Sequence, residues 1–280
     1  MDKKLIDLFI KNAIAEDLGD GDHTSNSTIP AGTKGKAKLL VKEDGILAGV
    51  TLALEIFNQI DSTLQTEVFL NDGAEVNYGD VAFTVEGNTH AILLAERLVL
   101  NCMQRMSGIA TRTNHIVKLL EPYQTRLLDT RKTTPGMRYL EKWAVRIGGG
   151  VNHRIGLYDM ILIKDNHVDY AGGIANAITA SNQYLADKGK QLDIEIEVRN
   201  LEELNQVLET GKIQRIMLDN FDFPALRKAV ELIDHQYITE ASGGITEENI
   251  TQYADCGVDY ISMGALTHSV KSLDMSLKAY

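Results

Sequence analysis

From residue 126 onward the sequence alternates short apolar runs with amphipathic stretches, and this alternation constrains the fold more than any other feature. The stretches between the runs have helical spacing, as in LEELNQVLE and FPALRKAVELI. Nearly continuous apolar strands that alternate with helices predict a parallel sheet covered on both faces. About seven units fit a closed or nearly closed α/β barrel. An open flavodoxin-like or Rossmann sheet is the alternative, because strand order cannot be read from sequence. The apolar runs are RLLD at 126–129, MILI at 160–163, DIEIEV at 193–198, RIML at 215–218, YITEAS at 237–242 and VDYISMG at 258–264.

The N-terminal part has a different pattern, with short extended runs separated by Asp-Gly and similar turns. This pattern predicts a small α+β domain with an antiparallel sheet. Few prolines and no low-complexity tract interrupt the chain, so no flexible linker is expected. The predicted elements are helices at 4–18, 51–60 and 90–120, the last as one or two helices, and strands at 36–41, 65–70 and 81–87.

The charge balance excludes one class of protein. The chain carries 28 Lys and Arg against 39 Asp and Glu, a net charge of −11. Nonspecific nucleic-acid binding needs a basic surface, so no nucleic-acid partner is expected. No long apolar run and no secretory signal pattern occur, so we expect no membrane contact and a cytoplasmic location. The two cysteines, Cys102 and Cys256, are expected to lie reduced in the core.

Polar and charged residues follow the predicted strands at the ends where a parallel barrel carries its active site. Six such positions are more than chance would place at one edge. They are Thr130–Thr134, Lys164–His167, Glu195 with Glu197, Asp219 with Asn220, Ser242–Gly244 and Gly264.

Segment 126–167 is cationic inside an acidic chain, with eight Lys or Arg residues against four acidic ones. Such a cluster predicts a concave site for a small polyanion. Arg138, Lys142 and Arg146, spaced four apart, are instead expected on a solvated helix surface. The candidate anion ligands are Arg131, Lys132, Arg154 and Lys164, which lie at strand ends or in loops.

Two small-residue turns, SGGI and MGALTHS, follow consecutive predicted strands. Backbone N–H groups in such turns bind phosphate, and barrels often build a phosphate site after their last two strands. Glu197 and Asp219 end adjacent strands, where they could hold Mg²⁺, bind sugar hydroxyls or pair with nearby cations. Glu195 faces the same way as Glu197, so sequence does not decide between them. No dinucleotide or P-loop motif is present.

The run DTRKTTPGMRYLEKWAVRIGGGVNHRIGLYDMILIKDNHV resembles the central signature of the quinolinate phosphoribosyltransferases, also called carboxylating nicotinate-nucleotide pyrophosphorylases. Matching segments cover nearly the whole chain. They are EDLGDGDHTS, ERLVLNCMQRMSGIAT, EIEV, MLDNF, EASGGI and GVDYISMGALTHS.

The resemblance implies an N-terminal α+β sandwich domain, assigned to 1–110, and an incomplete TIM-like barrel of seven strands at 111–268. Residues 269–280 are expected to form a C-terminal helix that packs back on the N-terminal domain. The resemblance also implies a homodimer with shared active sites. The implied reaction joins quinolinate to phosphoribosyl pyrophosphate with Mg²⁺, giving nicotinate mononucleotide, pyrophosphate and CO₂ in de novo NAD biosynthesis.

The resemblance also assigns site residues. Arg131, His153, Arg154 and Lys164 would bind quinolinate, with Arg97 reaching in from the other subunit. Lys132 and Lys164 would meet the phosphoribosyl pyrophosphate, and Glu197 and Asp219 would serve Mg²⁺ and the ribose. Lys132, Lys164, Glu197 and Asp219 form the implied catalytic set. The 5-phosphate would lie on Ser242, Gly243, Gly244 and Gly264.

Alternative roles remain open for some residues, and alternative functions remain open for the chain. Arg97 belongs to the row Arg97, Asn101 and Arg105, which by itself predicts a solvated helix stripe. His153 could be structural, although its Gly-rich surroundings favour a ligand role, and His23 is taken as structural. The rival functions are a nicotinate phosphoribosyltransferase, a Schiff-base aldolase or decarboxylase that uses Lys164, and a non-enzymatic phosphometabolite sensor.

Overall fold

The computed structural model describes residues 3–280, which form two compact units. Unit 1 contains the described residues up to His115, together with Thr133–Gly149 and Leu266–Tyr280. Unit 2 contains Ile116–Lys132 and Gly150–Ala265. The chain therefore enters unit 2 twice, whereas the sequence predicts consecutive domains.

An antiparallel sheet with the strand order β12-β1-β5-β3 forms the centre of unit 1. Ala37 of β1 pairs with Ala279 on one side and Val85 on the other. Ala37, Leu39 and Val41 are buried and alternate with more exposed residues, so one face of β1 is covered. The antiparallel sheet expected for the N-terminal part is thus present. The strands are β1 (Lys34–Val41), β3 (Gln65–Val68), β5 (Val81–Asn88) and β12 (Met275–Ala279).

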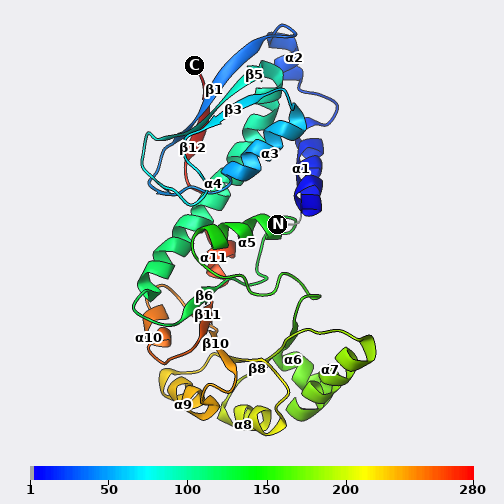
Figure 1. Ribbon diagram of the computed structural model, residues 1–280, viewed down its shortest axis with the longest axis vertical. Coiled ribbons are helices and arrows are strands. Elements are labelled where there is room, and N and C mark those ends of the chain that lie inside the picture. The colour runs from blue at the N-terminus through cyan, green and yellow to red at the C-terminus, as the bar shows by residue number, and fades with distance from the viewer. Residues whose placement is uncertain (1–2) are drawn as a thin grey trace. The chain divides into compact units, whose positions relative to one another are not determined.

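Helices α3 and α4 lie beside this sheet (Figure 1). Phe57 of α3 packs edge-on against Phe83 of β5, with 5.9 Å between the ring centroids. The stretch expected as one or two helices at 90–120 is a single helix of 32 residues. The helices that lie in unit 1 or start there are α1 (Lys3–Leu18), α2 (His23–Thr28), α3 (Val50–Ile60), α4 (Thr89–Leu120) and α5 (Arg138–Ile147); a small ladder joins β2 (Gly45–Ile46) to β4 (Glu75–Val76).

The predicted C-terminal helix is wrong. Residues Met275–Ala279 form strand β12, which pairs antiparallel with β1. Met275 and Leu277 are buried while Ser276 between them is partly exposed, a period of two that suits a strand. An available edge of β1 supplies the ladder partners that this segment needs.

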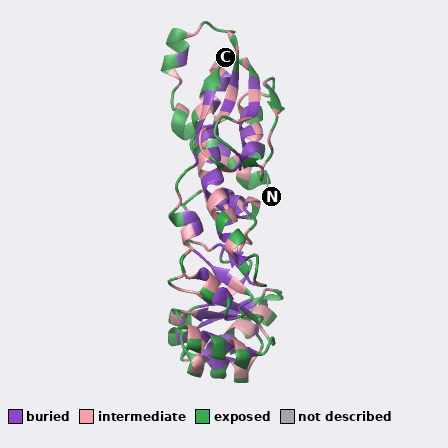
Figure 2. Ribbon diagram, turned by 90° about the vertical axis from the view of Figure 1, so that its left-hand side faces the viewer, coloured by how far each residue is buried: buried purple, intermediate pink, exposed green. Residues whose placement is uncertain are grey.

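A parallel sheet with the order β6-β11-β10-β9-β8-β7 forms the centre of unit 2. All five residues of β8 are buried, as expected for a strand covered on both faces. Figure 2 shows these strands in purple among helices whose outer residues are green. The strands are β6 (Arg126–Leu128), β7 (Ile161–Ile163), β8 (Ile194–Val198), β9 (Arg215–Asp219), β10 (Ile238–Ser242) and β11 (Tyr260–Ser262). The helices are α6 (Asp165–Ala171), α7 (Ile174–Lys188), α8 (Leu201–Thr210), α9 (Phe223–Ile233) and α10 (Ile250–Ala254), with α11 (Ala265–His268) at the junction with unit 1.

The strand order identifies a barrel-like winding and excludes the open doubly wound alternative. From β7 to β11 each strand pairs with the next one in the chain, and β11 then pairs with β6, the first. Val151 adds a parallel bridge to Leu128 on the other side of β6. Within residues 3–280 no ladder joins Val151 to β7, so the ring of six strands and one bridge is incomplete.

The segment after β7 differs from the sequence prediction. Lys164 was expected at a strand end or in a loop, but it is the N-cap of α6. The Lys164 N–H donates to His167 Nδ1 at 2.9 Å, which satisfies a backbone donor at the start of the helix. Gly172 and Gly173, with φ of 81° and 121°, then separate α6 from α7. The charged residues therefore lie on a helix start, which fixes their positions more firmly than a loop would.

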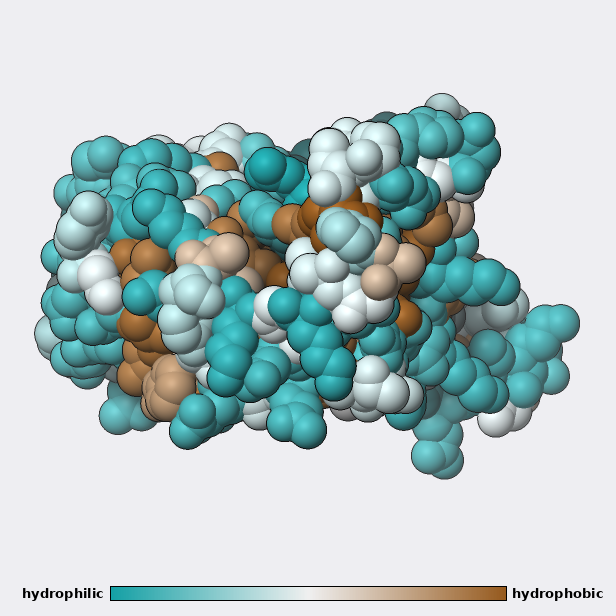
Figure 3. Space-filling model, turned by 90° about the horizontal axis from the view of Figure 1, so that it is seen from above, coloured by the Kyte–Doolittle hydropathy of each residue, from teal (hydrophilic) through white to brown (hydrophobic). Residues whose placement is uncertain are grey.

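None of the helices formed by residues 3–280 is both long and apolar enough to cross a bilayer. The face of the molecule seen in Figure 3 carries mainly hydrophilic side chains, with hydrophobic ones gathered in smaller areas between them. Both cysteines are free and buried, as predicted.

Candidate active site

The carboxyl ends of the strands of unit 2 carry an ion pair between Lys164 and Glu197. Lys164 Nζ lies 3.4 Å from Glu197 Oε2, and the Lys164 side chain is 49% exposed while that of Glu197 is 9% exposed. Burial raises the pKa of Glu197, and the nearby negative charge of Asp219 acts in the same direction, although Lys164 opposes both. A half-exposed ammonium group can contact an anionic ligand from the solvent side while it is paired with a carboxylate.

Arg131 and Arg154 form the cationic part of the site. Burial lowers the pKa of Arg154, and the positive charge of Arg131 lowers it further. The Arg154 side chain donates from Nη1 to the carbonyl of Met160 at 3.3 Å. Two guanidinium groups close enough to repel each other are stabilised by an anion between them.

A buried aspartate holds this part of the chain in place. Asp129, at the end of β6, is fully buried. It accepts hydrogen bonds from Asn152 Nδ2 at 2.5 Å and from the His153 backbone N–H at 2.9 Å. These bonds attach the residues before Arg154 to the strand end that leads to Arg131. Lys132 follows on the same turn and is exposed, with its backbone N–H bonded to Thr130 Oγ1.

The imidazole of His153 faces the interior of unit 2. Its Nε2 lies 2.9 Å from Glu195 Oε2 and 3.3 Å from Glu240 Oε2, and both carboxylates are fully buried. Burial alone would lower the pKa of His153, but the contacts with Glu195 and Glu240 outweigh burial and raise it to about 9. Burial and the charge of Glu240 also raise the pKa of Glu195. Strongly interacting groups titrate as one cluster, so this cluster retains a proton at neutral pH.

Glu195 and Glu197 therefore have different surroundings, which the sequence could not distinguish. Glu195 contacts His153, while Glu197 contacts Lys164 and lies near Asp219. Of the two, Glu197 is the carboxylate beside the exposed cation.

The turn after β10 needs its glycines. Gly243 and Gly244 have φ of 91° and 60°, in the left-handed region. A Cβ on Gly243 would lie 2.3 Å from Asn220 Oδ1. The Asn220 N–H donates to the Ser242 carbonyl at 2.8 Å, and its side chain donates to Asp219 at 2.6 Å. The turn is therefore packed against the residue that follows Asp219. The helices that follow β10 and β11 in the chain, α10 and α11, have only five and four residues, so turn backbone rather than a helix end would have to bind a phosphate.

The predicted row on α4 divides into two kinds of residue. Arg97 and Asn101 are exposed, as a solvated stripe requires. Arg105 is not part of it: the guanidinium lies 2.8 Å from Glu141 Oε1 and donates to the Thr267 carbonyl at 2.7 Å. Arg97 belongs to unit 1, whereas Arg131, His153, Arg154 and Lys164 all belong to unit 2.

The prediction of a solvated surface on α5 is also partly wrong. Lys142 is only 1% exposed, and its neighbour Glu141 is fully buried. The fourfold spacing of basic residues could not reveal this, because the partners of α5 come from distant parts of unit 1. Glu240 was missed as well, and its position in the middle of a strand predicted to be buried was the available signal.

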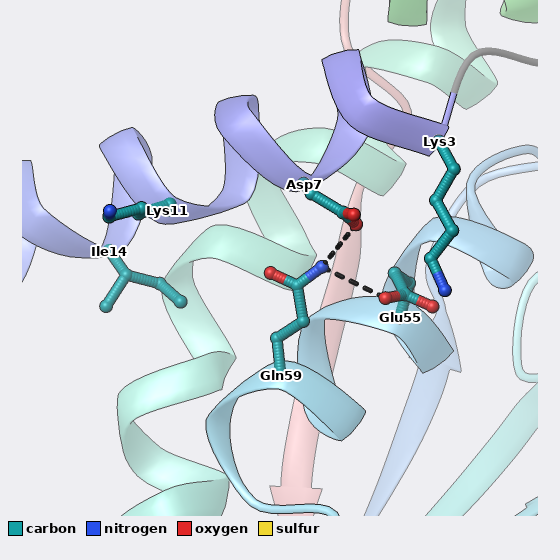
Figure 4. Close-up of a pocket in the computed structure, with 6 residues that line it drawn as sticks. All are labelled: Lys3, Asp7, Lys11, Ile14, Glu55 and Gln59. Carbon is teal, nitrogen blue, oxygen red and sulfur yellow. Dashed lines mark hydrogen bonds between the residues drawn. The ribbon is translucent and has the colours of Figure 1, made fainter.

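A cavity of about 500 Å³ in unit 1 is not part of the candidate active site. It lies between α1 and α3 and is lined by Lys3, Asp7, Lys11 and Glu55, with Gln59 donating to Asp7 and Glu55 (Figure 4). Its cations and carboxylates compensate one another, and none of the predicted site residues lines it.

Comparisons with known proteins agree on one family. Residues 22–107 match the N-terminal domain of quinolinate phosphoribosyl transferase, and residues 109–278 match its C-terminal domain. A mitochondrial quinolinate phosphoribosyltransferase [decarboxylating] from Nicotiana tabacum is 47% identical over 96% of this chain and 80% of its own length. A chloroplastic nicotinate-nucleotide pyrophosphorylase [carboxylating] from Arabidopsis thaliana is 49% identical over 96% of this chain and 81% of its own. The solved structure of the nicotinate-nucleotide pyrophosphorylase from Francisella tularensis has a TM-score of 0.92 and 40% identity, and the match covers 100% of this chain and 98% of that one.

Proposed function

Because this chain belongs to the quinolinate phosphoribosyltransferase family, we propose that it transfers the phosphoribosyl group of phosphoribosyl pyrophosphate to quinolinate with loss of CO₂. The products are nicotinate mononucleotide and pyrophosphate, in de novo NAD biosynthesis. The enzyme is a decarboxylating pentosyltransferase.

The observation that carries this proposal is the set of cations that follow the strands of unit 2: Arg131 after β6, Arg154 after the Val151 bridge, and Lys164 after β7, where it is paired with Glu197. Quinolinate has two carboxylates, which can pair with these cations. The proposed quinolinate ligands are Arg131, Arg154 and Lys164, with Arg97 of the partner subunit in a homodimer and His153 as the further member that the family resemblance adds.

The phosphoribosyl pyrophosphate is proposed to lie across the neighbouring strand ends. Lys132 and Lys164 would neutralise its phosphates, and the turn at Gly243 would receive the 5-phosphate through backbone N–H groups. Ser242, Gly244 and Gly264 complete this part of the site.

Mg²⁺ fits the carboxylates present. Glu197 and Asp219 end adjacent strands and are close enough for the charge of Asp219 to raise the pKa of Glu197. Mg²⁺ typically takes one or two protein carboxylates together with substrate oxygens. Bound there, it would neutralise charge on the pyrophosphate group.

The chain needs no nucleophile of its own for this reaction. Pyrophosphate leaves the ribose carbon with the bonding electrons, and the pyridine nitrogen of quinolinate forms the new bond to that carbon. When the adjacent carboxylate departs as CO₂, its bonding electron pair stays on the ring carbon, stabilised by the positive ring nitrogen, and a proton from water then forms the C–H bond of nicotinate mononucleotide. The cations hold the two reactants in place, and the carboxylates Glu197 and Asp219 favour the positive charge that develops on the ribose.

Two rival functions fit the geometry less well. A Schiff-base lysine is normally desolvated or next to another cation. Lys164 is instead half exposed and paired with Glu197. A nicotinate phosphoribosyltransferase would need fewer cations, because its substrate has one carboxylate less.

The cytoplasm remains the proposed location, since two free buried cysteines suit a reducing compartment.

The test is to incubate the protein with Mg²⁺, phosphoribosyl pyrophosphate and quinolinate, and to measure CO₂ and nicotinate mononucleotide together. Both products should appear in equal amounts. Nicotinate in place of quinolinate should react very poorly, because the loss of one buried ionic partner costs roughly 2–5 kcal/mol. Comparable turnover of nicotinate would contradict the proposal.

A further inference from the structure

Asn220 directly follows Asp219 at the carboxyl end of β9, and its backbone has an unusual conformation. Its φ is 55°, in the left-handed region, which is costly for most residues and less so for asparagine. Residues held in this region are concentrated at active sites and ligand-binding turns. Within residues 3–280 the other non-glycine residues with positive φ all precede β9 or β10, at the opposite edge of the sheet: Lys212, Asp234 and His235.

The backbone of Asn220 is bonded to the neighbouring strand. Asp219 of β9 and Ser242 of β10 are partners in the parallel ladder. The Asn220 N–H donates to the Ser242 carbonyl at 2.8 Å. This bond joins the residue after Asp219 to the first residue of the glycine turn, Ser242–Gly244.

The side-chain amide of Asn220 contacts both Asp219 and the turn. Its Nδ2 donates to Asp219 Oδ2 at 2.6 Å. Its Oδ1 lies where Gly243 has no side chain, since a Cβ there would be 2.3 Å from this oxygen. The opposite orientation of the amide would place its oxygen against the Asp219 carboxylate, so the carboxylate determines which way the amide faces. One side chain therefore fixes the orientation of Asp219 and packs on Gly243.

We propose that Asn220 is a positioning residue that joins two parts of the phosphoribosyl pyrophosphate site. Its side-chain amide orients the Asp219 carboxylate for Mg²⁺, and its backbone and side chain hold the turn Ser242–Gly244 for the 5-phosphate. The inference rests on the proposed function, because it takes Asp219 as a metal ligand and the turn as the phosphate site. Asn220 acts through these groups rather than through contact with the substrate, as residues that hydrogen-bond to metal ligands do.

Asn220→Gly separates the side chain from the backbone. Glycine adopts a φ of 55° without strain, so the N–H bond to Ser242 can be kept while the amide is lost. Affinity for phosphoribosyl pyrophosphate with Mg²⁺, measured by titration calorimetry, should fall roughly tenfold, because Asp219 is no longer oriented. Quinolinate affinity, measured separately, should be unchanged. An unchanged affinity for phosphoribosyl pyrophosphate, or an equal loss for both ligands, would overturn the proposal.

Lys212→Gly is the matched control. It also replaces a left-handed residue, with a φ of 60°, by glycine, but it does so before β9, at the opposite edge of the sheet. Both affinities should therefore equal those of the wild type. A loss of phosphoribosyl pyrophosphate affinity as large as that in Asn220→Gly would show that the effect is not specific to Asn220 and would overturn the proposal.

A double-mutant cycle with Gly243→Ala tests whether Asn220 holds the turn. In the wild-type background the alanine side chain meets the Asn220 amide. In the Asn220→Gly background that amide is absent, so only the strain of a φ of 91° remains. The loss of phosphoribosyl pyrophosphate affinity caused by Gly243→Ala should therefore be smaller in the Asn220→Gly background. Equal losses in the two backgrounds would overturn the proposal.

Urea unfolding of the same set of proteins measures the contact without any ligand. Gly243→Ala should lower the urea midpoint further in the wild-type background than in the Asn220→Gly background. Equal shifts of the midpoint would overturn the proposal. If the wild-type protein bound no phosphoribosyl pyrophosphate, the proposed function would fail, and the urea midpoints would still decide whether Asn220 holds the turn.

Discussion

At Gly243 both the backbone conformation and a neighbouring side chain restrict which residue can be present. Its φ of 91° disfavours any L side chain, and a Cβ would lie 2.3 Å from Asn220 Oδ1. Gly244 differs, since its φ is 60° and nothing lies within 4 Å of a Cβ built there. The two neighbouring glycines therefore form a matched pair.

We expect Gly243→Ala to raise the KM for phosphoribosyl pyrophosphate more than tenfold and to lower stability by about 1–3 kcal/mol, because Asn220 must move. Gly244→Ala introduces only left-handed strain, about 1–2 kcal/mol. Steady-state kinetics and urea unfolding of both variants test this. Equal effects on KM would show that the contact with Asn220 is irrelevant.

The carboxylates Glu197 and Asp219 should contribute to binding of phosphoribosyl pyrophosphate but not of quinolinate. Glu197→Ala and Asp219→Ala should weaken binding of Mg²⁺ with phosphoribosyl pyrophosphate and leave quinolinate binding mostly intact, because a carboxylate repels a dicarboxylate. Calorimetric titration with each ligand separately measures this. A selective loss of quinolinate binding would mean that the acids orient the arginines instead.

At the scale of elements, the ion pair between Arg105 and Glu141 connects α5 to α4. Glu141 is fully buried and also accepts from the Thr134 backbone N–H at 3.1 Å. Glu141→Ala would leave Arg105 without this partner. Because Arg105 is 24% exposed and water reaches it, the expected loss of stability is about 3 kcal/mol, the lower end for a broken buried pair.

Urea unfolding of Glu141→Ala measures that loss. Glu209→Ala, an exposed glutamate on α8, is the control and should change stability by no more than about 0.5 kcal/mol. Similar values for the two variants would show that the pair does not hold α5.

The elements also show how far the sequence could predict this structure. The alternation of apolar runs with amphipathic stretches predicted the parallel strands, because a strand buried on both faces is apolar along nearly its whole length. The order of those strands depends on which edges meet, and nothing local encodes the pairing of β6 with β11. For the same reason Met275–Ala279 was mistaken for a helix, since its partner β1 is distant in sequence.

The candidate site, like the fold, was predictable where the signal is local and unpredictable where it depends on distant parts of the chain. The cations and small-residue turns at strand ends were predictable from position, and the family resemblance assigned their roles. The environment of His153 was not predictable, because its contacts with Glu195 and Glu240 come from strands far along the chain. Lys142, likewise, is buried by parts of unit 1 that its spacing does not reveal.

At the scale of the whole molecule, the proposed homodimer can be tested by complementation. Arg97→Ala and Lys164→Ala should each fold, dimerise and lose activity, because they damage the two halves of a shared site. Mixing them with subunit exchange should restore roughly a quarter of wild-type activity, since about half the dimers are then mixed and have one intact site. Exchange is verified independently with differently labelled subunits. An absence of recovery would place Arg97 in its own subunit's site or outside any site.

The pairing of β1 with β12 also affects how the chain folds. Ala37 and Ala279 are neighbours in space but lie near opposite ends of the described chain, so their contact carries a large loop-closure entropy. During synthesis one edge of β1 has no partner until the ribosome has passed Ala279. Until then that edge is open to pairing with other nascent chains. The rate at which this sheet is completed should therefore depend on translation and on chaperones that cover β1, rather than on the stability of the finished fold.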